Sequence, residues 1–467
     1  MFHDAKITYI FEEKAITSVF FLIILHAEMF FNRIKVLNMN KILASFVLAT
    51  LTTSAFAQSD TNSPYSQFGL GDLSDQSVSF NKGMNGVGLA MRRGNEANPM
   101  NPASYSSIDS LTMIFDAGMS GQITKFNENG NKVTGRSGGF DYVVGLFRAF
   151  KNVGVSFGVL PYSNIGYSYS ESKVLSESTQ VVSAYEGSGG LHQLYIGTGI
   201  RPIKPLSLGF NISYLWGDYN RSMGSIEGTY LSALTKEYRA DISSYKFDLG
   251  MQLELPISKN DNITLAATWS PGHSLKSDPE CLITNIGTTI SKADTMVYTV
   301  SDGLSIPTTY GFGIAYNHAQ NLRFGADLQI QKWGGVDYPL LVTDNQTKVT
   351  TYTMKSGLLK DSYRFNIGGE WTPKPMGRYF LQRVRYRAGV GMATPYYYIN
   401  GKEGPKELSA SIGFGIPIMN GYNNRSILSI SGQFVRRSAD NMIKENMFRL
   451  NIGFTFNERW FAKWKVE

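Results

Sequence analysis

The sequence predicts an all-β fold, a transmembrane antiparallel β-barrel of about 14 strands with an N-terminal plug segment. Two observations predict it. Apolar and polar residues alternate with a period of two along most of the chain after residue 110, and no apolar run is long enough for a membrane-spanning helix. The longest apolar candidate, 16–25, is about half of the roughly 20 residues that such a helix needs. A membrane protein with this sequence would therefore cross with strands.

The alternation is clearest near the C-terminus. Between 448 and 456 every second residue is Phe, Leu or Ile, and the residues between them are Arg, Asn, Gly and Thr. The same sorting recurs at 384–392 and 408–418. Because successive side chains of a strand point to opposite faces, each segment has one apolar and one polar face. In a membrane barrel the apolar face contacts lipid and the polar face lines the lumen.

Charged residues within these segments predict which face is the lumen. An arginine on the lipid face near the bilayer midplane costs about 2 to 4 kcal/mol. We therefore expect the charged residues of the strands to point inward, namely Arg364, Arg385, Arg387, Arg449, Asp116, Asp141, Asp248, Asp327 and Glu370.

Fourteen segments carry the pattern. They are 111–125, 138–150, 153–169, 191–202, 205–219, 243–256, 261–270, 306–317, 320–333, 361–373, 382–393, 406–418, 425–437 and 445–457. The connections are short after the even-numbered segments and mostly longer after the odd-numbered ones, which is typical of outer-membrane barrels. The stretches 271–305 and 335–360 are rich in Val, Ile and Thr and could hide another hairpin, so sixteen strands remain an alternative.

A soluble β-sandwich would show the same alternation, but the length argues against it. One sandwich uses about 100 residues, and this chain shows neither a repeat nor a linker that would divide it into several. Trp216, Trp269, Trp333 and Trp371 also lie near ends of the expected strands, where an aromatic girdle would place them.

The N-terminus predicts export. Met39-Asn-Lys, an apolar run at 42–51 and the small residues that end at Ala57 form the three parts of a secretory signal. The expected organisation is a non-native stretch or extended leader at 1–38, a signal peptide at 39–57, an N-terminal plug at 58–110 and the barrel at 111–467. The expected location is the outer membrane of a Gram-negative bacterium.

Composition excludes several classes. The single cysteine, Cys281, rules out a disulfide framework and multi-cysteine metal sites, and is expected to be an idle loop thiol. The net charge of +7 is spread along the chain and not gathered into a basic run, so nucleic acid is not an expected partner. No cofactor and no metal are expected.

Two motifs lie between the expected signal and the first strand. Gly83–Met91 reads GMNGVGLAM, and Asn98–Tyr105 reads NPMNPASY. A glycine-rich segment followed by Asn-Pro-Ala, directly before a fourteen-stranded barrel, resembles the long-chain fatty acid and hydrophobic compound transporters of the outer membrane, the FadL-like family, here as a Bacteroidetes-type member. The resemblance covers the layout of the mature chain, and at residue level it rests on 83–105.

The resemblance implies a mechanism and a gate. In that family the N-terminal segment folds inside the barrel as a hatch, and hydrophobic compounds enter a groove and leave laterally into the membrane. The gate residues would be Asn98, Pro99, Asn101, Pro102 and Ala103. The charged run 92–96 departs from the family pattern and the duplicated Asn-Pro leaves the register open, so specific ligand residues are not carried over.

The third strand is a second point of resemblance, because family members have an inward kink there that opens the wall. In this chain Pro161 stands in the middle of that strand. Proline supplies no N–H to the ladder, so pairing must fail locally. The residues Pro161, Asn164 and Gly166 therefore mark either a lateral opening or a plain bulge at the rim.

Three arginines are candidates for binding a ligand head group. The guanidinium groups of Arg364, Arg385 and Arg387 could each bind a carboxylate through two hydrogen bonds. The alternative is that they neutralise neighbouring acids in a packed lumen.

Passive uptake of a hydrophobic, fatty-acid-like molecule is the first functional hypothesis, with outer-membrane lipid and that ligand as partners. The alternative is an accessory or docking subunit of a protein secretion system, with a secretion or envelope protein as partner, and a third is a structural barrel with a sealed interior. A transporter should show a continuous apolar groove from the outer loops to Pro161. A docking barrel should co-purify with its partner.

An enzyme is not expected. A barrel hydrolase needs a serine with a histidine beside it on one wall. His192, His273 and His318 are the histidines of the mature chain, and the last two fall in expected connections. The glycines at 83–88 are not a phosphate loop, because no strand precedes them and no Gly-Lys-Ser/Thr follows.

Overall fold

The computed structural model describes residues 61–128, 130–176, 179–227, 232–286, 294–319, 321–344, 346, 349–418 and 426–459. The chain divides into two units, 1–57 and 58–467, and the description concerns the second. The signal peptide expected at 39–57 and the leader expected at 1–38 lie outside the described residues, so both stay predictions.

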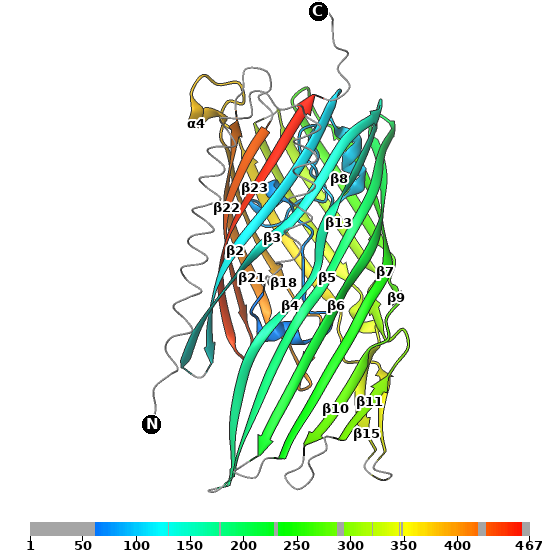
Figure 1. The fold of residues 1–467 in the computed structure, drawn as a ribbon. Helices are drawn as coiled ribbons and strands as arrows, with labels where there is room; N and C mark the ends of the chain where they lie inside the picture. The colour runs from blue at the N-terminus through cyan, green and yellow to red at the C-terminus, as the bar shows by residue number, and fades with distance from the viewer. Residues whose placement is uncertain are drawn as a thin grey trace, which may run out of the picture. The chain divides into compact units, whose positions relative to one another are not determined.

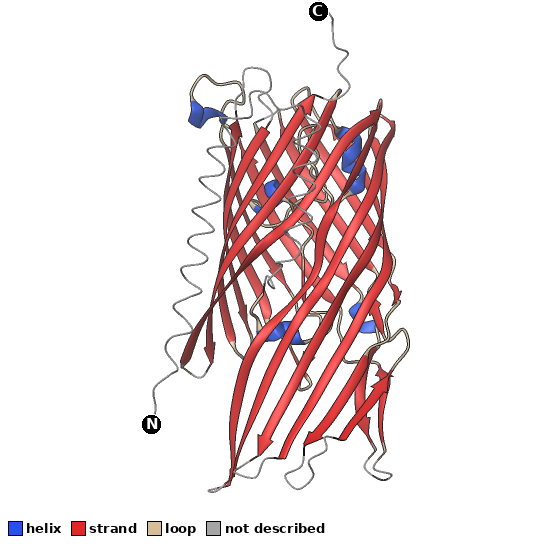
Figure 2. Ribbon diagram, in the orientation of Figure 1, coloured by secondary structure: helices blue, strands red, loops and turns tan. Residues whose placement is uncertain are grey.

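Fourteen strands of the described chain form one closed antiparallel barrel (Figures 1 and 2). Each pairs with the next along the chain, and the last closes the barrel against the first, with Thr112 opposite Arg459. The strands are β2 (Thr112–Glu128), β3 (Asn131–Phe150), β4 (Val153–Ser176), β5 (Thr179–Ile203), β6 (Leu206–Glu227), β7 (Ser232–Pro256), β8 (Asp261–Ser270), β13 (Thr309–His318), β14 (Leu322–Gln331), β17 (Ser362–Trp371), β18 (Arg385–Ala393), β21 (Lys406–Ile418), β22 (Ser426–Ser438) and β23 (Lys444–Arg459). The predicted fold class is confirmed.

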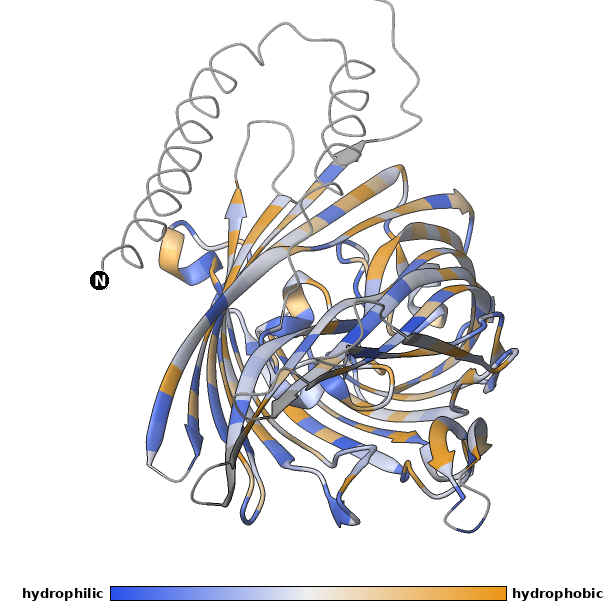
Figure 3. Ribbon diagram, turned by 60° about the horizontal axis from the view of Figure 1, so that its bottom comes forward, coloured by the Kyte–Doolittle hydropathy of each residue, from blue (hydrophilic) through white to orange (hydrophobic). Residues whose placement is uncertain are grey.

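The two faces of the barrel wall differ as the alternation predicts. In β17 the side chains of Tyr363, Phe365 and Ile367 are exposed on the outside, whereas Asn366 and Glu370 on the opposite face are buried. Figure 3 shows the same change between hydrophobic and hydrophilic residues along the strands. Hydrocarbon offers no partner for backbone N–H and C=O groups, so a sheet with this outer face is stable in lipid only as a closed barrel.

The charged residues of the strands face inward as expected. Asp116, Asp327 and Arg387 are buried and contact residues of the N-terminal segment. The expected girdle is wrong for Trp333, which is fully buried beneath Tyr396 inside the loops. Trp269 and Trp371 are exposed.

Strand lengths differ from the expectation on one flank. β4 and β5 contain 24 and 25 residues and β7 contains 25, whereas β8, β13, β14 and β17 contain 10 each. The described residues of the loops expected at 126–137, 170–190 and 220–242 are therefore almost all strand, and the expectation of long connections after the first, third and fifth strands is wrong. The apolar alternation marks only the part of a strand that meets lipid, and backbone pairing continues into water without it.

We call the side of the barrel with the connections 151–152, 204–205 and 257–260 the turn side, and the opposite side the loop side. The loop side carries additional hairpins. They are built from β9 (His273–Leu275) with β12 (Leu304–Ile306), β10 (Glu280–Ile286) with β11 (Asp294–Thr299), β15 (Tyr338–Thr343) with β16 (Thr350–Lys355), and β19 (Tyr398–Ile399) with β20 (Lys402–Glu403), and η5 (Trp333–Gly335) lies among them.

These hairpins do not enter the barrel wall, so the described barrel keeps fourteen strands and not sixteen. β10 pairs with the part of β7 that extends beyond β8, with Glu280 opposite Arg239. Cys281 is therefore a buried strand residue opposite Tyr238, and the expectation of a loop thiol is wrong.

The N-terminal segment lies inside the barrel (Figure 1). We call residues 61–110 the lumenal segment. It contains η3 (Pro64–Gln67), β1 (Asp72–Leu73), α3 (Ser79–Lys82) and η4 (Pro102–Ser107). Its apolar side chains, among them Val78, Met84 and Val87, are fully buried against the inner wall, so the core of this barrel is its lumen. No helix in the described ranges is long and apolar enough to span a membrane.

Candidate functional site

The Asn-Pro-Ala motif forms the start of η4. The Asn101 side chain accepts a hydrogen bond from the backbone N–H of Ala103 (3.1 Å), and its amide donates to the carbonyl of Leu89 (2.9 Å). Pro102 occupies the first helical position, where a backbone N–H would have no partner within the helix, so proline removes no hydrogen bond there. Asn98 donates to the carbonyl of Gly88 (2.7 Å). The motif is therefore joined to the glycine-rich stretch 83–91, and Pro99 beside it lines a lumen cavity.

Three wall glycines make room for this turn. A Cβ atom added to Gly199, Gly209 or Gly250 would lie closer than 3.0 Å to Pro102 or Asn101, a separation that real Cβ atoms do not show. The three glycines belong to the neighbouring strands β5, β6 and β7, so η4 packs directly on wall backbone. The sequence did not reveal this contact, because a glycine in a strand carries no sign of what approaches it.

An ion-pair cluster fixes the charged run 92–96 of the lumenal segment to the wall. Its members are Arg93 and Glu96 with Arg323 of β14, Glu370 of β17, and Arg385 and Arg387 of β18. Glu370 accepts from Arg387 at 2.7 Å and from Arg323 at 2.9 Å, and Arg323 also reaches Glu96 at 3.1 Å. The cluster thus contains four arginines and two glutamates, an excess of two positive charges.

Glu96 is held ionised by this cluster. Burial alone would raise the pKa of its carboxyl, but the guanidinium groups of Arg323, Arg93 and Arg385 outweigh burial and hold that pKa well below its usual range. The charged run 92–96, which departs from the pattern of the resembled family, is therefore the main polar anchor of the lumenal segment at the turn side.

The loop side has an ion-pair cluster of the opposite composition. Arg437 contacts Asp72 at 2.9 Å, Glu407 at 2.9 Å and Glu445 at 3.7 Å. Ser63 also donates to Glu445, at 2.6 Å. Among the described side chains one arginine here contacts three carboxyl groups, so the acidic groups outnumber the cations.

Arg364 differs from the other two head-group candidates. Arg385 and Arg387 are engaged with Glu96 and Glu370. No carboxylate of the described residues lies within 4.0 Å of the Arg364 guanidinium, and Arg364 lines three lumen cavities. The three cavities have volumes of about 90, 70 and 110 Å³.

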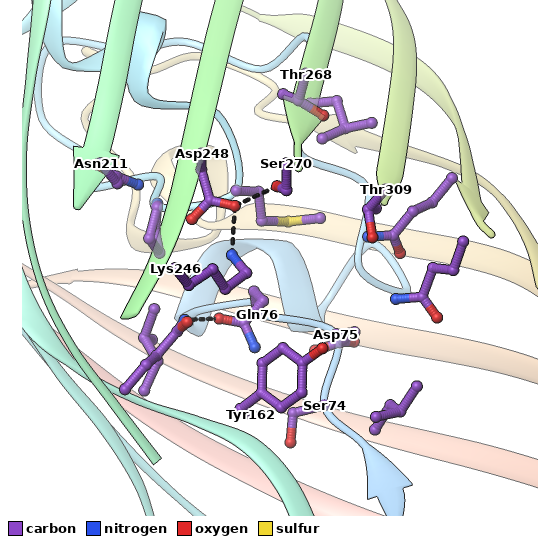
Figure 4. A pocket seen from close by; sticks show the side chains of 18 of the residues that line it. Ser74, Asp75, Gln76, Tyr162, Asn211, Lys246, Asp248, Thr268, Ser270 and Thr309 are labelled. Atoms are coloured by element: carbon purple, nitrogen blue, oxygen red, sulfur yellow. Dashed lines mark hydrogen bonds and ion pairs between the residues drawn. The ribbon is translucent and has the colours of Figure 1, made fainter. Parts of the chain in front are cut away.

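The residues around the first cavity are mostly polar. Figure 4 shows Asp248 between Lys246 and Ser270, with Gln76, Asp75 and Tyr162 across the space. Each cavity has room for several waters and is well below the roughly 300 to 1,000 Å³ of pockets that hold drug-sized ligands. None of these three cavities is the continuous apolar groove expected of a transporter.

Pro161 lies where two wall strands separate. The pairing of β3 with β4 ends at Val143 and Val159, while β4 continues to pair with β5 as far as Ser176. The β4–β5 register shifts between Pro161 and Ser163. Beyond this point β3 pairs with β2 alone, and Figure 1 shows the β2–β3 hairpin diverging from β4.

The lumenal segment occupies part of the edge that β3 leaves. Leu73 pairs with Ser163 and Asp72 with Asn164, and the Gln76 side chain donates to the carbonyl of Pro161 (2.8 Å). Gly166 donates its N–H to the Ser66 hydroxyl (3.1 Å). The cavity of about 110 Å³ reaches this edge, because its lining includes Asp141 and Tyr142 of β3 and Leu160 and Pro161 of β4.

The three histidines considered for catalysis lie apart. His192 of β5 packs on Trp216, His273 of β9 stacks on Tyr245, and His318 of β13 contacts Asp261.

The barrel fold is shared with solved transporter structures. The Pseudomonas putida toluene transporter TodX has 13% identity and a TM-score of 0.59 over 83% of this chain and 100% of that chain. The Ralstonia pickettii toluene transporter TbuX has 13% identity and a TM-score of 0.55 over 83% and 99%. A Pseudomonas aeruginosa FadL homologue has 10% identity and a TM-score of 0.57 over 82% and 99%.

At this level of identity the likeness shows the fold alone, so the class defined here is a transmembrane β-barrel of FadL-like architecture. The family model named BamG matches residues 39–467, and the chain belongs to the BamG family. The resemblance seen in the sequence therefore holds for the fold, while the family is a different one. No curated protein matches the chain in sequence.

Proposed function

We propose that the protein resides in the outer membrane of a Gram-negative bacterium and takes up hydrophobic, fatty-acid-like molecules passively, releasing them through the wall between β3 and β4. The observation that carries the proposal is the end of β3–β4 pairing at Val143 and Val159, beside a lumen cavity that both strands line. Lipid offers no hydrogen-bond partners, so an unpaired strand edge at membrane depth is costly. The pairing of β3 with β4 ends here in spite of that cost, and an opening through which a ligand leaves the barrel would account for it.

The entry side would be the loop side. A depression there is lined by Phe68, Tyr338 and Tyr397 together with Arg221, which offers aromatic surface beside a cation. A molecule entering here would meet residues 72–76 of the lumenal segment, which border all three lumen cavities.

Residues 74–76, which follow the pairing of β1 with β4, would form the moving part of the gate. Ser74 and Gln76 are tied to β4 by single hydrogen bonds to Tyr162 and Pro161. The cavities are too small for a ligand in the described arrangement, so uptake requires this stretch to move. Asn98, Pro99, Asn101, Pro102 and Ala103 would be the fixed end of the gate, because η4 packs on wall glycines.

Arg364 would bind the ligand's head group. Arg364 lines the cavities, and none of the described carboxylates lies within 4.0 Å of its guanidinium, so it can meet an incoming carboxylate without breaking a close ion pair. Arg385 and Arg387 would have to give up Glu96 or Glu370 first.

Mass spectrometry of lipids extracted from protein purified out of native outer membranes tests the proposal. We expect an enriched hydrophobic acid in the wild type, loss of most of it in Arg364→Ala and retention in Arg449→Ala. Arg449 is a matched control, because it also lines a lumen cavity but hydrogen-bonds Gln122. Equal, background amounts of lipid in all three proteins would overturn uptake.

The second candidate is an accessory or docking subunit of a protein secretion system. Two observations favour it: the polar lining of the cavities, and the extension of β4–β7 far beyond the roughly 9 to 11 residues that cross a bilayer. The projecting sheet and its hairpins would be the docking surface. A stoichiometric protein companion in the same purification, without an enriched lipid, is the result expected for this function.

A further inference from the structure

The connection between β17 and β18 presents an unusual apolar surface. It runs from 372 to 384 and contains the short helix α4 (Phe380–Arg383). Met376 is 93% exposed, Tyr379 69%, Leu381 67% and Phe380 49%. Three other connections of the turn side each have one such residue at their edge: Phe150, Ile203 and Ile257.

This exposure is built into the loop. Arg383 donates two hydrogen bonds, at 2.9 Å each, to the carbonyls of Gly377 and Arg378. The backbone N–H of Lys374 donates to the carbonyl of Gln382 (2.8 Å) and closes the loop at its base. Tyr386 donates to the carbonyl of Leu381 (3.1 Å). The loop is therefore held in a defined shape and tied to the start of β18, with its apolar side chains exposed.

The loop adjoins the lipid-facing surface of the barrel. Figure 1 shows α4 outside the wall, at the end of the barrel where β23 ends. Trp371 and Tyr386, at the base of the loop, lie with their ring centroids 5.7 Å apart, and Tyr386 also contacts Phe414 of the outer face (6.0 Å). Trp and Tyr are enriched where a membrane protein passes from hydrocarbon to water. The apolar surface of the loop thus continues the aromatic edge of the membrane belt.

The charge of the loop fits the same surface. Lys374 and Arg378 are exposed, and residues 372–384 contain neither Asp nor Glu. A segment with apolar side chains and basic residues binds at the boundary between phospholipid head groups and acyl chains, and anionic lipid strengthens that binding.

We propose that residues 374–383 are an interfacial anchor. Met376, Tyr379, Phe380 and Leu381 insert into the head-group region of the turn-side leaflet, and Lys374 and Arg378 contact lipid phosphates. The anchor requires only the transmembrane barrel, and it holds whether the protein is a transporter or a docking subunit.

Spin labelling of the full chain tests the anchor. A Cys281→Ala background removes the native thiol, and Leu381→Cys carries the label, with Lys259→Cys in the β7–β8 connection as the matched control. Both proteins are reconstituted in vesicles of phosphatidylethanolamine and phosphatidylglycerol, and the accessibility of each label to oxygen and to a water-soluble nickel complex is measured. We expect an oxygen-to-nickel ratio several-fold higher at 381 than at 259.

Equal ratios at the two positions would overturn the proposal. Protection of position 381 in native membranes but not in vesicles would also overturn it, in favour of a protein partner. The charge reversal Lys374→Glu with Arg378→Glu should lower the ratio at 381 in vesicles that contain phosphatidylglycerol and leave it unchanged in vesicles of phosphatidylcholine alone. A double variant that keeps the wild-type ratio in both would contradict the role of the basic residues.

Discussion

The two ends of the lumenal segment are fixed to the wall by ion pairs of opposite balance. At the turn side Glu96 joins a cluster of four arginines and two glutamates, and at the loop side Asp72 shares Arg437 with two further carboxylates. Each carboxylate at the turn side has several cations, so losing one cation leaves the others in place. At the loop side all three carboxylates depend on one arginine. The difference predicts that the turn side tolerates the loss of one arginine, whereas the loop side does not.

The largest loss of stability is expected when one of the two glutamates of the turn-side cluster is removed, because arginines outnumber glutamates there. Glu370→Gln leaves four arginines with one glutamate, and breaking such buried pairs costs about 3 to 5 kcal/mol of unfolding free energy. Denaturant titration of the reconstituted barrel, followed by gel mobility, measures it. Glu237→Gln removes an exposed pair with Arg239 and should cost less than about 1 kcal/mol. Similar losses in both variants would contradict the importance of the cluster.

Removing one arginine from each ion-pair cluster also compares the two sides of the barrel. Arg437→Gln leaves three carboxylates unpaired and should cost about 3 kcal/mol. Arg387→Gln should cost about 1 kcal/mol although Arg387 is the more deeply buried, because Arg323 and Arg93 still serve Glu370. Denaturant titration of both variants gives the order, and a larger loss for Arg387→Gln would show that burial matters more than charge balance.

A smaller effect is expected from overpacking the turn side. Gly250→Leu places a side chain where Asn101 and Pro102 lie, and an overfilled contact of this kind costs about 1 to 3 kcal/mol. Gly121→Ala is the control, since nothing lies within 4 Å of the position of its Cβ. Limited proteolysis should cut residues 87–108 faster in Gly250→Leu alone. Unchanged cleavage of residues 87–108 would mean that η4 can pack at another place on the wall.

The smallest expected effect is a gradual loss of stability of the lumenal segment as the pH falls. The pKa of Glu96 is lowered to about 2 in the folded protein, from an ordinary value of 4.5. A carboxylate with a lowered pKa stabilises the fold above its unfolded pKa and loses that contribution as the pH falls toward the folded value. Hydrogen exchange of residues 87–108, corrected for its intrinsic rate, should show constant protection from pH 7 to pH 5 and a decline below about 4.5. A decline that begins at pH 6 would point to another group.

Much of the barrel could be predicted from the sequence because alternation is local. The segment 406–418 coincides with β21, and the segments around Arg364, Arg387 and Arg449 were placed with the correct face inward. The lengths of β4–β7 could not be predicted, because strands that project into water no longer need an apolar face.

The partners inside the lumen could not be predicted either. Arg385 and Glu96 are 289 residues apart in the sequence, and nothing at either position indicates the other. Asn101 stood out as part of a motif, but its fit depends on glycines of three separate strands. The interruption near Pro161 was suggested by proline chemistry, whereas the edge that β1 occupies there depends on a two-residue pairing.

The unequal strand lengths also bear on the bilayer itself. A strand of 10 residues, such as β8 or β17, rises about 33 Å, and a tilt near 45° leaves about 23 Å along the membrane normal. The apolar band of an outer-membrane barrel is about 25 Å tall, so these short strands end close to the membrane surface. The strands β4–β7, with 22 to 25 residues, continue well beyond it. A neighbouring molecule in the same membrane would therefore meet a projecting sheet on one flank of the barrel and only loops and short hairpins on the other.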